Sequence, residues 1–141
     1  FNHFSVPYHL TTKEFNERVR AWLADDGFYV VNIIDGPYGE FVRAYYNTLR
    51  QTFHHVYLAE GTGTWRKASR SMFLLLASDV PLDESALTQY DGGDGDPLLA
   101  RMMAGPDEIQ TLLTEAPLVT LTDQYAPVDQ MLASVFREDV P

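Results

Sequence analysis

The sequence predicts an α/β domain in which a mostly parallel sheet with one antiparallel strand carries helices on its faces. Apolar residues at helical spacing alternate with short runs of β-branched and aromatic residues over positions 10–60. The strand candidates at 54–60 and 71–79 are joined only by the loop "GTGTWRKASR". Two strands joined without a helix can pair only antiparallel or lie apart, so we expect the antiparallel strand at one end of the sheet.

The first helix is predicted over the segment 10–27, "LTTKEFNERVRAWLADDG". Thr11 and Glu14 have the spacing of a capping box, and Gly27 suits a helix C-terminal cap. One apolar stripe follows the helical period, and its residues are Phe15, Val19, Trp22 and Leu23. The pattern therefore predicts that Trp22 belongs to the core.

Three strands and a second helix follow. "FYVVNIID" at 28–35 has apolar residues on both faces, which is typical of a buried parallel strand. Helical spacing returns over 39–53, and "HHVYLAE" at 54–60 and "SMFLLLASD" at 71–79 are further strands, the latter the most apolar. His54 and His55 would point to opposite faces of a strand, so we expect no metal site there.

The closing region is predicted as an acidic loop, "DGGDGD" at 91–96, short helices at 96–104 and 106–116, and an extended segment at 117–132. The loop does not have the spacing of an EF-hand, so an acidic loop is favoured over a calcium site. Three strands and two long helices make a narrow sheet, and a Gly-rich turn for a nucleotide is absent. We therefore expect residues 1–141 to be one partial domain whose nucleotide-binding half precedes Phe1.

The composition limits the class of partner. The 141 residues include 20 Asp and Glu against 10 Lys and Arg, which gives a net charge of -10. That sign opposes binding to nucleic acid or to an anionic membrane and suits a cationic substrate, although a solvated acidic surface has the same composition. The chain has no Cys, so thiolate chemistry and disulfides are excluded, and its longest apolar run, "MFLLLA", is too short to span a bilayer.

Several polar and aromatic residues are candidates for a binding site. Tyr8, with His9, lies in a loop at the expected carboxyl edge of the sheet, where open α/β folds bind ligands. Asn32 is an amide late in an apolar strand, and burial would require a partner, which a ligand, water or the backbone could supply. Asp35 ends the same strand. Each of these residues also has an ordinary structural explanation.

Two further candidates lie later in the chain. Trp65 stands in a Gly-containing loop, where its ring could pack on the methylene chain of a polyamine or cover a local core. Arg66 beside it would repel a polycation. Asp123 and Tyr125 belong to the Pro-interrupted segment "TDQYAPVDQ", which could close the cleft, dock a subunit or simply pack.

Five stretches together have the character of a known family, and they are "PYHLTTKEF", "VRAWLADDGFYVVNIID", "GEFVRAYYNTLRQTFHHVYL", "SRSMFLLLASD" and "LTDQYAPVDQML". Through them the sequence resembles the C-terminal part of spermidine synthase-like proteins, which are aminopropyltransferases with a Rossmann-like methyltransferase fold. The resemblance is strongest over 6–58 and 119–132. Within the family, the sequence is most similar to bacterial members that are often fused to a membrane transporter region.

The resemblance implies what the chain contains and what it lacks. The family binds decarboxylated S-adenosylmethionine, and its Gly-rich loop, its ribose-binding acid and its catalytic Asp would all precede Phe1. Pro7 matches the Pro of the family's Gly-Pro-Ala loop on the adenine side, whereas Val6 and Tyr8 depart from its small residues. Asn32 stands where the synthases have a Gln near the substrate amine.

The activity implied is transfer of an aminopropyl group to a polyamine, with this piece inactive alone and with no tightly bound cofactor or metal. The alternatives are a methyltransferase fragment that uses S-adenosylmethionine, and a non-catalytic binding or dimerisation module. A homodimer is one way to cover the open sheet edge. The resemblance also implies a cytoplasmic location, either free or as the cytosolic domain of a membrane-fused protein.

Overall fold

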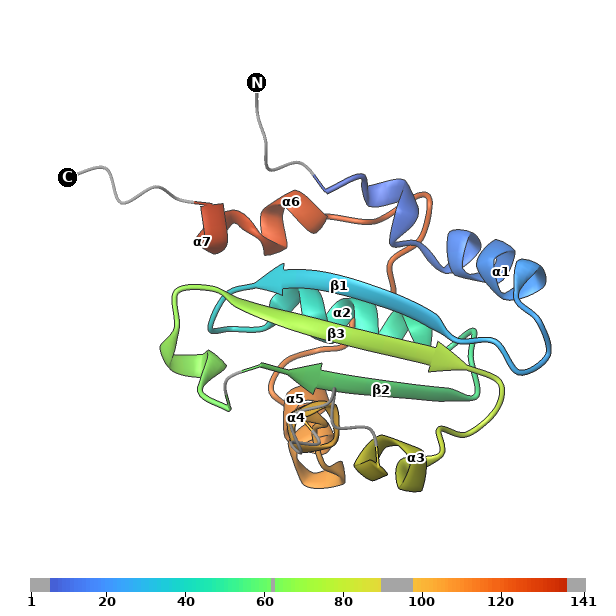
Figure 1. The fold of residues 1–141 in the computed structure, drawn as a ribbon. Coiled ribbons are helices and arrows are strands. Elements are labelled where there is room, and N and C mark those ends of the chain that lie inside the picture. Colours follow the sequence, from blue (N-terminus) through green and yellow to red (C-terminus); the bar gives the residue numbers. More distant parts are fainter. Residues whose placement is uncertain (1–5, 62, 90–97, 137–141) are drawn as a thin grey trace.

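The computed structural model describes residues 6–61, 63–89 and 98–136 of the chain (Figure 1). The predicted acidic loop at 91–96 lies outside these ranges. In chain order the elements are η1 (Tyr8–Leu10), α1 (Lys13–Trp22), β1 (Tyr29–Asp35), α2 (Glu40–Leu49), β2 (His55–Glu60), η2 (Trp65–Lys67), β3 (Ser71–Ser78), α3 (Glu84–Gln89), α4 (Leu98–Met102), α5 (Pro106–Thr114), α6 (Val128–Met131) and α7 (Ala133–Phe136).

The sheet has three strands in the order β1-β3-β2, and β3 pairs antiparallel with both neighbours. β1 and β2 therefore run in the same direction without touching each other. The prediction of a mostly parallel sheet with the antiparallel strand at one end is wrong for the described residues, because β3 inserts between the two strands that precede it. This insertion places the most apolar strand in the centre, where each of its backbone edges finds a partner.

Helix α2 forms the middle layer of the fold and lies behind the sheet in Figure 1. Every residue from Phe41 to Leu49 is buried, as expected of a helix covered on all sides. Its polar side chains bond to the segment that crosses its outer surface. Asn47 donates from Nδ2 to the Val119 carbonyl at 3.0 Å, and the Leu121 amide donates to Thr48 Oγ1 at 2.9 Å. These bonds offset the cost of burying polar groups.

The opposite face of the sheet is open along β1. Val30, Asn32 and Ile34 are exposed, and Met72 of β3, the partner of Ile34, is 59% exposed. Figure 1 shows this face toward the viewer, with α2 on the far side. The prediction that 28–35 is a strand buried on both faces is therefore wrong. Among the described residues no strand pairs with the outer edge of β1, which lies at the end of the sheet.

The N-cap of helix α1 lies one residue later than predicted. Thr12, not Thr11, accepts the Phe15 amide at 3.2 Å, while the Thr11 hydroxyl donates to the Tyr8 carbonyl. The buried side of the helix carries Asn16 and Val19. Trp22 is 74% exposed, so its assignment to the core is wrong. The buried stripe is rotated away from Trp22 because Asn16, a polar residue, occupies it.

Candidate functional site

The carboxyl end of β1 is built around Asp35, whose side chain is only 1% exposed. Its Oδ1 accepts the Gly36 amide at 2.7 Å and its Oδ2 accepts the Val42 amide at 2.8 Å. The carboxylate thus satisfies an amide at the start of α2, where the helix would otherwise leave donors unpaired. A ligand would have to open these bonds in order to reach Asp35.

The pKa of Asp35 is raised to about 6, chiefly because burial disfavours the charged form and in smaller part because the Glu40 carboxylate lies nearby. The amides of Val42, Gly36 and Phe41 act in the opposite direction, since they stabilise the charge. A carboxyl group that titrates near neutrality at the end of a strand is a common feature of binding sites and of buried structural carboxylates alike.

Trp65 packs against the same helix start and is 8% exposed. A Cβ built on Gly39 would lie 2.9 Å from Trp65 Cη2, and the Trp65 ring meets Phe73 edge to face with centroids 5.3 Å apart. The Arg66 guanidinium lies 4.2 Å from the ring centroid. The sequence left two roles open for the Trp65 ring, packing on a polyamine or covering a local core. In the structure the ring covers a local core, and the cation that stacks on it is Arg66.

A second group of candidates lies around the start of α1. The Thr12 hydroxyl donates to Asp123 Oδ1 at 2.7 Å, and the Asp123 amide donates to Glu14 Oε2 at 3.0 Å. Asp123 and Tyr125 belong to a tight turn in which Thr122 and Tyr125 exchange backbone hydrogen bonds of 2.9 and 3.0 Å. The turn therefore docks on the helix start beside η1.

The loop before α1 presents two of the predicted site residues to solvent. Pro7 and Tyr8 are exposed, and the Pro7 carbonyl accepts the Leu10 amide at 2.9 Å, which closes η1. Tyr125 is 60% exposed and Tyr8 is 53% exposed, so a ligand in solution could contact either ring. Thr12 links this loop to the turn, because its hydroxyl lies 3.5 Å from the His9 carbonyl and 2.7 Å from Asp123 Oδ1.

Asn32 belongs to neither group. Its side chain is exposed on the open face of the sheet, between Val30 and Ile34. A buried amide would need a partner, whereas the exposure of Asn32 removes that requirement. The same exposure leaves the amide free to meet a ligand that covers this face.

The fold of this chain is similar to that of a solved structure. A probable spermidine synthase from Corynebacterium glutamicum ATCC 13032 matches 85% of this chain with a TM-score of 0.63 and 23% sequence identity. The fold is spermidine synthase-like. The match spans 44% of that synthase, so this chain corresponds to less than half of it. None of the protein-family models matches the chain, and no curated protein does either.

The spermidine synthase-like fold carries no evident metal centre in the part that the structure describes, since no three His, Asp or Glu side chains there gather as ligands. His54 bonds through Nδ1 to Asp79 at 2.9 Å, which gives it an acidic partner. None of the helices within the described ranges is both long and apolar enough to cross a bilayer.

Sequence reasoning missed two parts of this site. The bonds of Thr12 and Glu14 to Asp123 join positions more than a hundred residues apart, and no local pattern indicates such a contact. Glu60 is also buried, at the carboxyl end of β2, and its Oε2 accepts the Gly63 amide at 2.5 Å. An acid at the end of an apolar strand is the signal that could have identified it, as it did for Asp35.

Proposed function

We propose that this chain is the C-terminal portion of an aminopropyltransferase-like protein. The observation that carries the proposal is the likeness of its fold to a probable spermidine synthase over 85% of the chain. In the proposed reaction, the nitrogen of an amine attacks the aminopropyl carbon of decarboxylated S-adenosylmethionine. A C–N bond forms, the C–S bond breaks, methylthioadenosine leaves, and the amine loses a proton to a base in the N-terminal half.

The described residues would contribute binding groups to that reaction. The exposed loop of Pro7 and Tyr8 would border the nucleoside, and the turn of Asp123 and Tyr125 would hold that loop through Thr12. Asn32 would offer its amide oxygen to the acceptor amine. A net charge of -10 favours the approach of a polycation, which supports a polyamine as acceptor.

The proposal is tested on the complete protein, expressed from the coding sequence that includes whatever precedes Phe1. We expect it to release methylthioadenosine from decarboxylated S-adenosylmethionine only when putrescine or a longer polyamine is present, and we expect the 141-residue chain alone to release none. Asn32→Ala should raise KM for the amine about tenfold, because a hydrogen bond to a charged group contributes roughly 1.5 kcal/mol.

Gln110→Ala, on the exposed surface of α5, is the matched control and should leave KM unchanged. Transfer of a methyl group from S-adenosylmethionine, with no reaction of the decarboxylated form, would replace the proposal by the methyltransferase alternative. Turnover by the 141-residue chain alone would contradict the division of the site between two halves.

A second candidate function is a binding or dimerisation module, and the free edge of β1 favours it. The strand exposes Val30 and Ile34 beside this edge and has no Lys, Pro or bulge to discourage pairing. We expect the 141-residue chain to sediment as a dimer or larger species, and Ile34→Lys to shift it toward the monomer. Sedimentation of the unsubstituted chain as a monomer at all concentrations would remove this candidate.

A further inference from the structure

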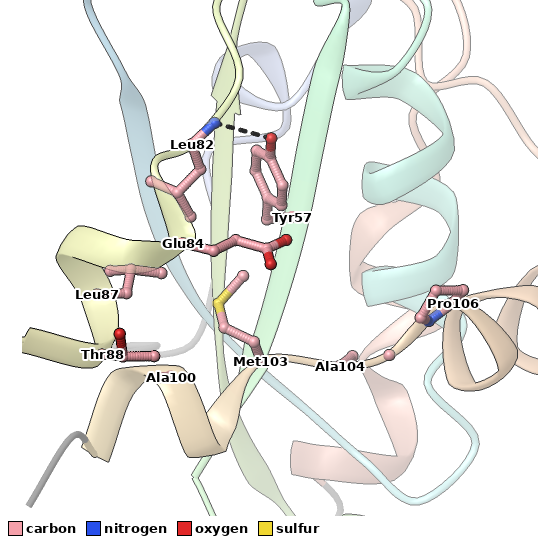
Figure 2. Close-up of a pocket in the computed structure, with 10 residues that line it drawn as sticks. Tyr57, Leu82, Glu84, Leu87, Thr88, Ala100, Met103, Ala104 and Pro106 are labelled. Carbon is pink, nitrogen blue, oxygen red and sulfur yellow. Dashed lines mark hydrogen bonds between the residues drawn. The ribbon is translucent and has the colours of Figure 1, made fainter.

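A pocket of about 300 Å³ lies between β2 and the helices α3 and α4 (Figure 2). Its volume is at the lower end of the range for small-molecule sites. None of the candidate residues discussed above contributes to its wall. The residues that line it are Tyr57, Leu82, Glu84, Leu87, Thr88, Ala100, Met103, Ala104, Gly105 and Pro106.

Backbone bonds hold two walls of this pocket against the sheet. The Leu82 amide donates to the Tyr57 hydroxyl at 2.9 Å, so the loop before α3 is tied to the ring. On the other side the Ala104 amide donates to the Leu58 carbonyl at 2.8 Å, and Met103 forms an isolated bridge with Ala59. Because the protein's own groups make all of these contacts, the cavity is formed in advance of binding.

The lining is apolar on one side and carries a carboxylate on another. Leu82, Leu87 and Met103 make one apolar surface, and Ala100 and Pro106 extend it. Figure 2 shows the Glu84 carboxylate pointing into the pocket, toward the Tyr57 ring and the Met103 side chain. The Glu84 side chain forms no hydrogen bond or ion pair with any other residue that the structure describes.

A carboxylate without a partner beside an aromatic ring attracts an organic cation, and an apolar wall next to it accepts a hydrocarbon chain. We propose that this pocket binds a primary alkylammonium ion, with the ammonium group at Glu84 and Tyr57 and the chain along Leu87 and Met103. The site differs from the proposed acceptor site, since it lies on β2 and away from Asn32.

Among the residues that the structure describes, Glu84 is the one carboxylate in the lining, so this part of the pocket suits a ligand with a single charge at one end. A second ammonium group at the far end of the chain would meet Met103 and Ala104 and would lose its hydration without a partner. We therefore expect hexylammonium to bind more tightly than 1,6-diaminohexane, although the overall charge of -10 attracts the dication more strongly from a distance.

The test is a titration of the 141-residue chain with hexylammonium, 1,6-diaminohexane and hexan-1-ol at one ionic strength, followed by amide chemical shifts. Hexylammonium should perturb the amides of Tyr57, Leu87 and Met103. Glu84→Gln should weaken hexylammonium about threefold to fivefold, the range typical of an exposed ion pair, and should leave hexan-1-ol unchanged. Ala100→Leu fills the cavity and should weaken all three probes at least tenfold.

Glu17→Gln, an exposed carboxylate on α1, is the control for general attraction to an acidic surface and should change nothing. Three results would each overturn the proposal. They are equal loss of hexylammonium binding in Glu17→Gln and Glu84→Gln, tighter binding of the diamine than of hexylammonium, and binding that survives Ala100→Leu. The amide spectrum of each variant reports whether it is folded before any ligand is added.

Discussion

Replacing Gly39 by Ala should lower the free energy of unfolding by about 3 kcal/mol, the sum of a left-handed backbone penalty and a steric one. Gly39 has a φ of 58° and precedes α2. A Cβ there would lie 2.9 Å from Trp65 Cη2 and 3.2 Å from Val42 Cγ1. Both neighbours are buried, so neither can move away without disturbing the core. Thermal unfolding should show a loss of roughly 10 °C.

Gly63 is the matched control for this substitution. Its φ is 64°, but a Cβ there would lie within 4 Å of no other residue that the structure describes. Gly63→Ala should therefore cost only the backbone term, about 1 kcal/mol. The difference between the two variants isolates the contact with Trp65. If Gly39→Ala and Gly63→Ala lose the same stability, the Trp65 contact is not tight in solution; partial rescue of Gly39→Ala by Trp65→Leu would confirm it.

Asp35 should make the folded chain less stable as pH rises from about 4 to 6. The pKa of an unperturbed Asp carboxyl group is 3.8, and that of Asp35 in the folded chain is about 6, so between these values the folded chain keeps a proton that the unfolded chain has released. The stabilising contribution of the protonated group is complete below pH 4 and is lost as pH passes 6. The loss amounts to about 3 kcal/mol for a shift of this size.

The measurement is denaturant unfolding of the wild-type chain and of Asp35→Asn at a series of pH values. The amide does not titrate, so the stability of the variant relative to the wild type should increase by up to about 3 kcal/mol between pH 4 and pH 7. Asp25→Asn alters an exposed carboxylate and serves as the control for general charge effects. A difference between wild type and Asp35→Asn that stays constant with pH would contradict the raised pKa.

Local patterns predicted the elements of the fold better than their arrangement. The strands at β1, β2 and β3 and the helices α1 and α2 follow from apolar periodicity, which reports on each segment alone. The insertion of β3 between β1 and β2 does not follow from periodicity. The apolar pattern of β3 would be the same at the end of the sheet as between the two strands. Trp22 shows the same limit, since the side of α1 that is buried depends on what α1 packs against.

The candidate site was predictable only where a residue type is unusual for its element. Asp35 and Asn32 are conspicuous because they interrupt apolar β1, but the pattern does not distinguish the buried Asp35 from the exposed Asn32. Their environments depend on α2 covering one face of the sheet and leaving the other open. The contact of Thr12 with Asp123 arises from the path of the chain after α5, which no segment of the sequence specifies alone.

The central position of β3 determines when the sheet can form. Tyr29 pairs with Ala77 and Asp35 pairs with Ser71, and β2 has no partner strand other than β3 among the residues described. During synthesis, neither β1 nor β2 can form its pairing with β3 until β3 has been made. At about 5 to 20 residues per second, the ribosome adds the intervening 40 or so residues in roughly 2 to 8 s. Throughout that interval the edge of β1 that later pairs with β3 is open to other nascent chains, which makes β1 a segment on which a chaperone would act.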